Sequence, residues 1–99
     1  MEKFLLKLNL YSMHQYFAIT DVKPLEDYKL LLTFENGEQR IFDMKPHLNT
    51  GIFRELKDKH VFNSVKVNFD TIEWSNKADF DPEILYEQGK LINQIEKIV

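Results

Sequence analysis

Four carboxylates lie close together near the C-terminal end of the sequence. Glu73 is followed by Asp79, Asp81 and Glu83, and the last three alternate with other residues. Carboxylate oxygens are the ligands of hard cations such as Ca²⁺ and Mg²⁺. The spacing lacks the glycine and the distal glutamate of an EF-hand loop, and the same residues suit the start of a helix. We therefore interpret the group as helix capping, with a cation site as the alternative, and we predict no metal and no cofactor.

The histidines and serines do not form a catalytic pattern. His14, His47 and His60 are far apart, and no metal-ligand spacing joins them to one another or to a carboxylate. A nucleophilic serine would need an orienting histidine and a sharp strand-to-helix turn, and neither accompanies Ser12, Ser64 or Ser75. The sequence contains no cysteine, which excludes thiolate catalysis and cysteine-bound zinc. The sequence predicts no catalytic residue and no enzyme.

Aromatic and apolar residues near the C-terminus are candidates for contacts with a partner. Tryptophan and tyrosine dominate protein interfaces, although for Trp74 a position in the core is the favoured interpretation. The last residues carry an apolar stripe at helical spacing, which a short helix cannot bury alone. The stripe could pack on the N-terminal segment of the same chain or across a dimer axis. The candidate partner contacts are Trp74, Tyr86, Leu91, Ile95 and Ile98.

A basic segment crosses the middle of the chain. Residues 45–66 hold five basic and two acidic residues, a net charge of +3, whereas the whole chain carries −3. Arg54, Lys57 and Lys59 could contact a phosphate backbone. The sequence shows no recognition helix and no aromatic pair for reading bases, so a solvated surface is the favoured interpretation and nucleic-acid binding is the alternative.

The composition is that of one small folded domain. The chain has 99 residues and 11.9 kDa, of which 43% are hydrophobic and 29% charged, too apolar for intrinsic disorder. Lys7 and Asn9 interrupt the apolar N-terminal run, no signal-peptide cleavage site follows, and no stretch approaches the roughly 20 apolar residues of a membrane span. We expect a single domain over residues 1–99, a cytoplasmic location of bacterial type, and no membrane contact.

The elements that would position these residues are strands and short helices. Alternating apolar residues predict an antiparallel meander with strands near 17–23, 28–35 and 38–43, the first ending at Pro24. Asn36-Gly37 suits a two-residue type I′ turn. That turn would pair Leu32 with Ile41 and place Ile41 on the face of Leu30 and Phe34, with Phe42 and Leu31 on the other face.

A short helix and a second hairpin are expected after the meander. The helix spans 51–58 with Phe53 and Leu56 facing inward. The second hairpin has strands near 64–69 and 72–75 and a turn at Asp70-Thr71. Alternation places Phe69 on its half-buried face with Val65 and Val67.

The strongest helix signal begins at residue 82. Asp81 can cap the helix, Pro82 suits its first position, and Phe80 and Leu85 occupy the staple positions. The apolar face continues to Leu91 and Ile95, unless Gly89 separates two helices. Residues 1–16 fit either a helix or a strand. The fold class is α+β.

Several motifs occur in a recognisable order. ITDVKPLEDYKLLLTFENGEQRIFDM is followed by GIFRELKD and then by I-x-W-x-x-x-x-D-x-x-P-x-x-L-Y, whose letters are Ile72, Trp74, Asp79, Pro82, Leu85 and Tyr86. The chain resembles domain-of-unknown-function family 2442, a family of small bacterial proteins, over a core of about 17–86, with extensions at 1–16 and 87–99. Where relatives often carry a glycine, this chain has Lys77, and Asp70-Thr71 replaces a glycine-rich turn.

The resemblance implies a fold and no established activity. It implies a curved sheet flanked by a short helix, without catalytic residues. Some relatives are fused to a helix-turn-helix domain, and others are encoded beside a second small protein in a toxin–antitoxin-like arrangement. Some carry a molybdopterin-guanine dinucleotide biosynthesis label, although this sequence has no glycine-rich phosphate loop for nucleotidyl transfer.

We therefore expect a non-enzymatic binding or adaptor module that acts through protein–protein contacts. It would form a homo-oligomer or bind a protein encoded nearby. The alternatives are a regulatory component of a two-gene module that touches nucleic acid, and an accessory role in molybdopterin-guanine dinucleotide biosynthesis.

Overall fold

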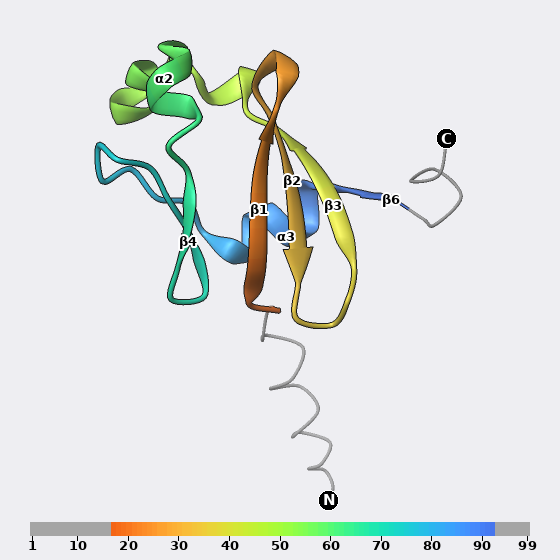
Figure 1. Cartoon of the computed structure of the whole chain (residues 1–99). Coiled ribbons are helices and arrows are strands. Elements are labelled where there is room, and N and C mark those ends of the chain that lie inside the picture. Colours follow the sequence, from red (N-terminus) through yellow and green to blue (C-terminus); the bar gives the residue numbers. More distant parts are fainter. Residues whose placement is uncertain (1–16, 93–99) are drawn as a thin grey trace, which may run out of the picture.

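The computed structural model describes residues 17–92, which form two antiparallel sheets and several short helices. The larger sheet has the order β1-β2-β3-β6, with β1 (Ile19–Leu25), β2 (Lys29–Phe34), β3 (Gln39–Asp43) and β6 (Lys90–Ile92). The second sheet is the hairpin of β4 (Lys66–Asn68) and β5 (Thr71–Glu73), which lies beside β1 (Figure 1). The predicted α+β class, meander and second hairpin are confirmed. The predictions for 1–16, Ile95 and Ile98 lie outside the described residues.

The helices are short and lie at the ends of the strands. They are η1 (Glu26–Tyr28), η2 (Lys45–His47), η3 (Gly51–Lys57), α2 (Lys59–Phe62) and α3 (Pro82–Gln88). The predicted helix at 51–58 is confirmed as the 3₁₀ helix η3, with Leu56 fully buried and Phe53 packed against the core. Helix α2 was not predicted; it begins where the carboxylate of Asp58 accepts a hydrogen bond from the backbone of His60 at 2.9 Å.

One apolar core joins the inner face of the larger sheet to the hairpin and the helices. Figure 1 shows α3 behind β2 and β3. Trp74 is 1% exposed and its Nε1 donates a hydrogen bond to the backbone oxygen of Phe62 at 3.0 Å. The buried apolar residues are Ile19, Leu30, Leu32, Phe34, Phe42, Met44, Leu48, Leu56, Phe62, Val65, Ile72, Trp74, Ala78, Phe80 and Leu85.

The register of the first hairpin differs from the prediction by one residue. Leu31 pairs with Ile41 and Leu30 with Phe42, so Phe42 is buried and Ile41 lies on the outer face. The turn has three loop residues and Gly37 takes a φ of 88°. A type I turn followed by a left-handed glycine has this geometry. Because side chains alternate along a strand, the extra loop residue moved the whole third strand to its other face.

Pro24 does not end β1, as was predicted, but lies inside it and pairs with Leu30. The strand is at the edge of the larger sheet. A proline is tolerated on an edge strand because its missing N–H can face away from the neighbouring strand.

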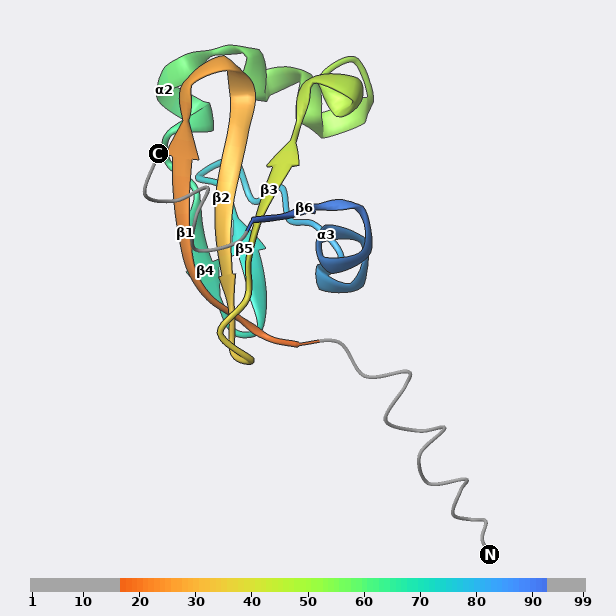
Figure 2. The same ribbon diagram turned by 90° about the vertical axis from the view of Figure 1, so that its right-hand side faces the viewer.

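The start of α3 is confirmed and its predicted extension is wrong. The Asp81 carboxylate accepts a hydrogen bond from the backbone of Glu83 at 2.9 Å, and Pro82 is at the first helical position. The helix ends at Gln88, and Leu91 lies in β6, which pairs with β3. A Cβ on Gly89 would lie 2.6 Å from the Leu85 oxygen and 3.1 Å from the Cβ of Arg40, so only glycine fits where the chain turns from α3 to the sheet (Figure 2).

The second hairpin turns one residue earlier than predicted. Asn68 pairs with Thr71, so Phe69 and Asp70 form the turn. Phe69, which alternation had placed on the half-buried face, is 94% exposed. The backbone N–H of Ile19 donates to the Asp70 oxygen at 3.1 Å, which ties this turn to the start of β1.

Candidate binding surfaces

A cavity of about 440 Å³ lies where the turn between β1 and β2 meets α2. This volume is within the range of ligand sites, roughly 300–1,000 Å³. The rings of Tyr28 and Phe62 meet edge to face in its wall, with their centroids 5.2 Å apart. The lining residues are Pro24, Leu25, Glu26, Asp27, Tyr28, Lys59, Phe62 and Asn63.

Two consecutive residues of this wall have a left-handed backbone. The φ angles of Asp27 and Tyr28 are 63° and 59°, a region that costs most L-residues about 1–2 kcal/mol each. Tyr28 is held by three contacts: its hydroxyl donates to the backbone oxygen of Lys57, its own backbone oxygen accepts from Met44 at 2.9 Å, and its ring packs on Phe62. These contacts offset the unfavourable backbone and fix the ring in the cavity wall.

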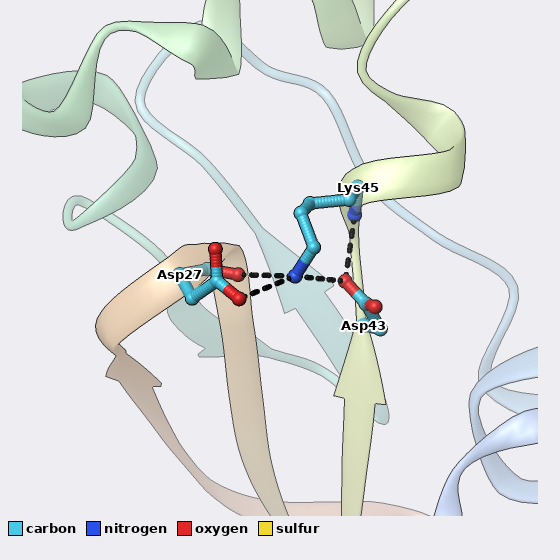
Figure 3. A network of polar contacts seen from close by, with 3 residues as sticks. All are labelled: Asp27, Asp43 and Lys45. Carbon is cyan, nitrogen blue, oxygen red and sulfur yellow. Dashed lines mark hydrogen bonds and ion pairs between the residues drawn. The ribbon is translucent and has the colours of Figure 1, made fainter.

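Lys45 holds the turn from the side (Figure 3). Its Nζ donates to the backbone oxygen of Asp27 at 2.9 Å and to the Asp27 carboxylate at 2.8 Å, and it lies 3.1 Å from Asp43. The hydrogen bond from Lys45 lowers the pKa of Asp27, and the bond to Asp27 raises the pKa of Lys45. For Asp43, partial desolvation raises the pKa, but hydrogen bonds from the Lys45 backbone and side chain outweigh this effect. The pKa of Asp43 is therefore lowered overall. These shifts move the pKa values of all three groups further from neutral pH, whereas a group that acts in acid–base catalysis needs a pKa near neutral pH.

A second surface lies near β6, which forms the edge of the larger sheet opposite to β1. We call this surface, which consists of Phe17, Arg40, Tyr86 and Leu91, the β6 edge surface. Phe17 and Tyr86 have ring centroids 5.1 Å apart, and the guanidinium carbon of Arg40 lies 4.0 Å from the centre of the Tyr86 ring. Leu91 pairs with Arg40 in the β3–β6 register. Phe17 is 37% and Leu91 is 49% exposed. Aromatic residues and arginine are the types that protein interfaces favour.

The structure brings together two of the predicted partner contacts. Tyr86 and Leu91 both adjoin Arg40. Trp74 is part of the core, so its ring offers no surface to a partner, and the core interpretation is the one that the structure supports. The predictions for Ile95 and Ile98 fall outside the described residues.

The predicted basic patch lies at the cavity end of the molecule. Arg54 and Lys57 are exposed on η3, and Lys59 is exposed on α2 with its Nζ 5.9 Å from the Tyr28 ring. The three cations occupy adjoining helices. Contact with nucleic acid stays a prediction.

Some of the carboxylates and histidines that could have done chemistry have structural contacts instead. Asp81 caps α3, and Asp79 is exposed and bridges Glu73 through the backbone. His47 stacks on Phe42 at 5.6 Å between centroids and meets Phe80 edge to face. Within residues 17–92, no three histidine, aspartate or glutamate side chains are grouped as a metal site would require.

Sequence reasoning missed two features. Tyr28 was predicted to begin the strand near 28–35 and Asp27 to precede it in an ordinary turn; aspartate, which tolerates positive φ, was the available signal there. Phe69 was assigned to the half-buried face of a strand because the turn signal of Asp70 was read as an Asp70-Thr71 turn, one residue too late.

Among the helices of residues 17–92, none has the length and apolarity that crossing a bilayer requires.

Comparisons with known proteins identify the family. No curated protein and no solved structure matches the chain. One family model matches residues 19–90, which is most of the chain, and this confirms the resemblance drawn from the sequence motifs. The chain therefore belongs to the family described as "Protein of unknown function (DUF2442)".

Proposed function

We propose that this chain is a non-catalytic binding module that acts through protein–protein contacts, and that the β6 edge surface contacts a second copy of the chain. The observation that carries the proposal is Leu91, which is 49% exposed on a three-residue edge strand beside Arg40 and Tyr86. An edge strand presents backbone N–H and C=O groups that a second strand can pair with. An apolar side chain at the same edge adds the burial that stabilises such a contact.

The occupant is a second copy because the edge is suited to self-pairing. A two-fold axis through Leu91 would lay β6 antiparallel to its symmetry mate and bring the two Leu91 side chains together. The predicted partner contacts Ile95 and Ile98 follow Ile92 in the sequence and lie outside the described residues.

The cavity end supports the non-catalytic part of the proposal. Its charged groups Asp27, Asp43 and Lys45 bind one another, and their pKa values are shifted away from neutral pH. Groups in this state stay charged at physiological pH and stabilise a turn rather than exchange protons with a substrate.

Sedimentation of three full-length proteins tests the proposal. We expect the wild type to be a dimer or larger and Leu91→Lys to dissociate, with a dissociation constant raised about tenfold or more, because an interface core rejects an unpaired charge. Ile52→Lys is the matched control, because Ile52 is 45% exposed on η3, away from the edge, and it should leave the assembly unchanged. A monomeric wild type, or equal effects of the two variants, would contradict the proposal.

A further inference from the structure

Phe69 at the tip of the β4–β5 hairpin is the most exposed large apolar residue among residues 17–92. It is 94% exposed, and its φ of 58° lies in the left-handed region. A positive φ on a bulky residue is an outlier, and glycine or asparagine would fit this turn position with less strain. Neither burial within residues 17–92 nor turn geometry accounts for a phenylalanine here.

The cavity is chemically suited to receive such a side chain. Pro24, Leu25, Tyr28 and Phe62 give it apolar and aromatic walls, and its volume is about 440 Å³. A closed cavity of about 150 Å³ is enough for benzene, so a phenyl ring fits with room to spare. Aromatic rings favour edge-to-face or offset-stacked contacts with centroids about 4.5–7 Å apart, and Tyr28 and Phe62 offer an entering ring two aromatic partners.

The tip and the cavity of one molecule cannot meet. Phe69 lies at the end of β1 that starts with Ile19, as the hydrogen bond between Ile19 and Asp70 shows. The cavity is at the other end, where Pro24 and Leu25 line it. At about 3.3 Å per residue the two ends of β1 are roughly 20 Å apart. Figure 1 shows the hairpin tip and α2 at opposite ends of the molecule.

We propose that Phe69 of one copy of this chain inserts into the cavity lined by Tyr28 and Phe62 of a second copy. This contact goes beyond the proposed function, because it uses neither β6 nor the β6 edge surface. Each copy carries one tip and one cavity, so the contact is heterologous and repeats from molecule to molecule, closing into a ring or continuing as a chain.

The charges at the two surfaces are compatible with the insertion. Lys59 lies 5.9 Å from the Tyr28 ring, a position from which its ammonium can also attract the face of an entering phenyl ring. The residue after Phe69 is the acidic Asp70, so this turn brings no like charge toward Lys59. Of the two acidic residues in the cavity wall, Asp27 is already paired with Lys45, and Glu26 is exposed.

A complementation experiment with two full-length variants tests this contact. Phe69→Asn keeps the cavity and removes the ring, and asparagine tolerates the left-handed turn. Asn63→Trp keeps Phe69 and fills the cavity, which Asn63 lines at an exposed position. Each variant alone should lose the contact, with self-association through it weakened about tenfold or more. An equimolar mixture should regain one contact per pair.

Backbone amide NMR locates the contact and separates it from the β6 edge. When unlabelled Asn63→Trp is added to ¹⁵N-labelled Phe69→Asn, shifts should appear at Leu25, Tyr28, Phe62 and Lys59 and saturate. Unlabelled Phe69→Asn should produce none there, whereas any pairing through β6 would move residues 39–41 and 90–92 in both titrations. Lys77→Asn, at another exposed left-handed turn residue, is the matched control and should retain the contact.

The same titrations can overturn the proposal. Absence of shifts around the cavity in the mixture would refute it, and so would equal shifts with the unlabelled Phe69→Asn protein. If the spectrum of Asn63→Trp shows that it is not folded, the unlabelled wild type serves as the donor of Phe69, with the same expected and contradicting results.

Discussion

The turns at 34–38 and 74–78 have the same backbone hydrogen bonds but different residues at the fourth position, which makes a sharp prediction possible. In both, the first residue donates to the fifth at 2.9 Å, the fourth donates back to the first at 2.9 Å, and an asparagine side chain accepts from the fifth at 3.0 Å. The fourth residue has positive φ: 88° for Gly37 and 74° for Lys77. Glycine therefore occupies the position in one turn and lysine in the other.

Substitutions at this position should have opposite effects in the two turns. A left-handed backbone costs an L-residue about 1–2 kcal/mol, and glycine loses about 0.5–1 kcal/mol more chain entropy on folding than alanine. Lys77→Gly should thus stabilise the fold by about 0.5–1 kcal/mol. Gly37→Ala should destabilise it by a similar amount, and it does so through the backbone alone, because a Cβ there would have no heavy atom within 4 Å.

Thermal unfolding followed by circular dichroism measures both effects. For a domain of this size, 1 kcal/mol shifts the midpoint by about 4–8 °C, so Lys77→Gly should raise the midpoint by roughly 2–8 °C. Lys77→Ala is the control, because it removes the lysine side chain and keeps the left-handed backbone, and we expect little change. If Lys77→Gly is no more stable than Lys77→Ala, or if Gly37→Ala costs nothing, positive φ does not govern these turns.

Two further predictions concern the packing of α3 and the charges beside the cavity. Gly89→Ala should destabilise the fold by about 1–3 kcal/mol, because the new Cβ would lie 2.6 Å from the Leu85 oxygen. Urea unfolding measures this loss, and Gln88→Ala, on the exposed side of α3, is the control. An unchanged urea midpoint for Gly89→Ala would contradict the close approach. Lys45→Met should reduce the acid sensitivity of the fold. The lowered pKa values of Asp27 and Asp43 contribute stability at pH values above the unfolded pKa of about 3.8, and this stability is lost as the pH falls through the folded pKa values. The unfolding free energy should therefore fall less between pH 6 and pH 2 in Lys45→Met than in the wild type or in the control Lys23→Met. Identical losses in all three proteins would show that Lys45 does not stabilise the turn through these carboxylates.

Local signals were sufficient for the elements that depend on neighbours in the sequence. Asp81 and Pro82 define the start of α3 by satisfying or removing backbone donors within one turn, and nothing distant is needed. Alternation likewise located β2 and β3, because their inner residues face one core. The family resemblance drawn from the same motifs is confirmed over residues 19–90.

The features that were mispredicted depend on distant contacts. Asn36-Gly37 is compatible with a loop of two or three residues, and the packing of Phe42 on Phe80, 5.3 Å between centroids, favours the longer loop. β6 pairs with β3 directly after Gly89, where the lack of a Cβ allows the chain to pass close to Leu85 and Arg40. Of the candidate contacts, Tyr86 and Leu91 were identified from residue type, but their shared neighbour Arg40 was not, since only the fold brings the three together.

The positive φ angles argue most directly for a contact outside the chain. Among residues 17–92, four non-glycine residues have them: Asp27, Tyr28, Phe69 and Lys77. At Asp27 and Tyr28 the unfavourable backbone is offset within the molecule, by Lys45 and by the hydroxyl and ring contacts of Tyr28. Phe69 and Lys77 are both exposed, and no side-chain contact within residues 17–92 that we describe offsets their backbone strain.

Lys77 and Phe69 therefore separate two explanations of a strained, exposed turn residue. A lysine in water costs only the backbone strain, so Lys77→Gly should gain stability and change nothing else. A phenylalanine that is 94% exposed gains almost no burial on folding to offset the same strain, so replacing it should also stabilise the monomer. If Phe69→Asn gains stability and loses self-association while Lys77→Gly gains stability alone, the ring of Phe69 is there for a second molecule. If both variants merely gain stability, the exposed ring has no role in assembly.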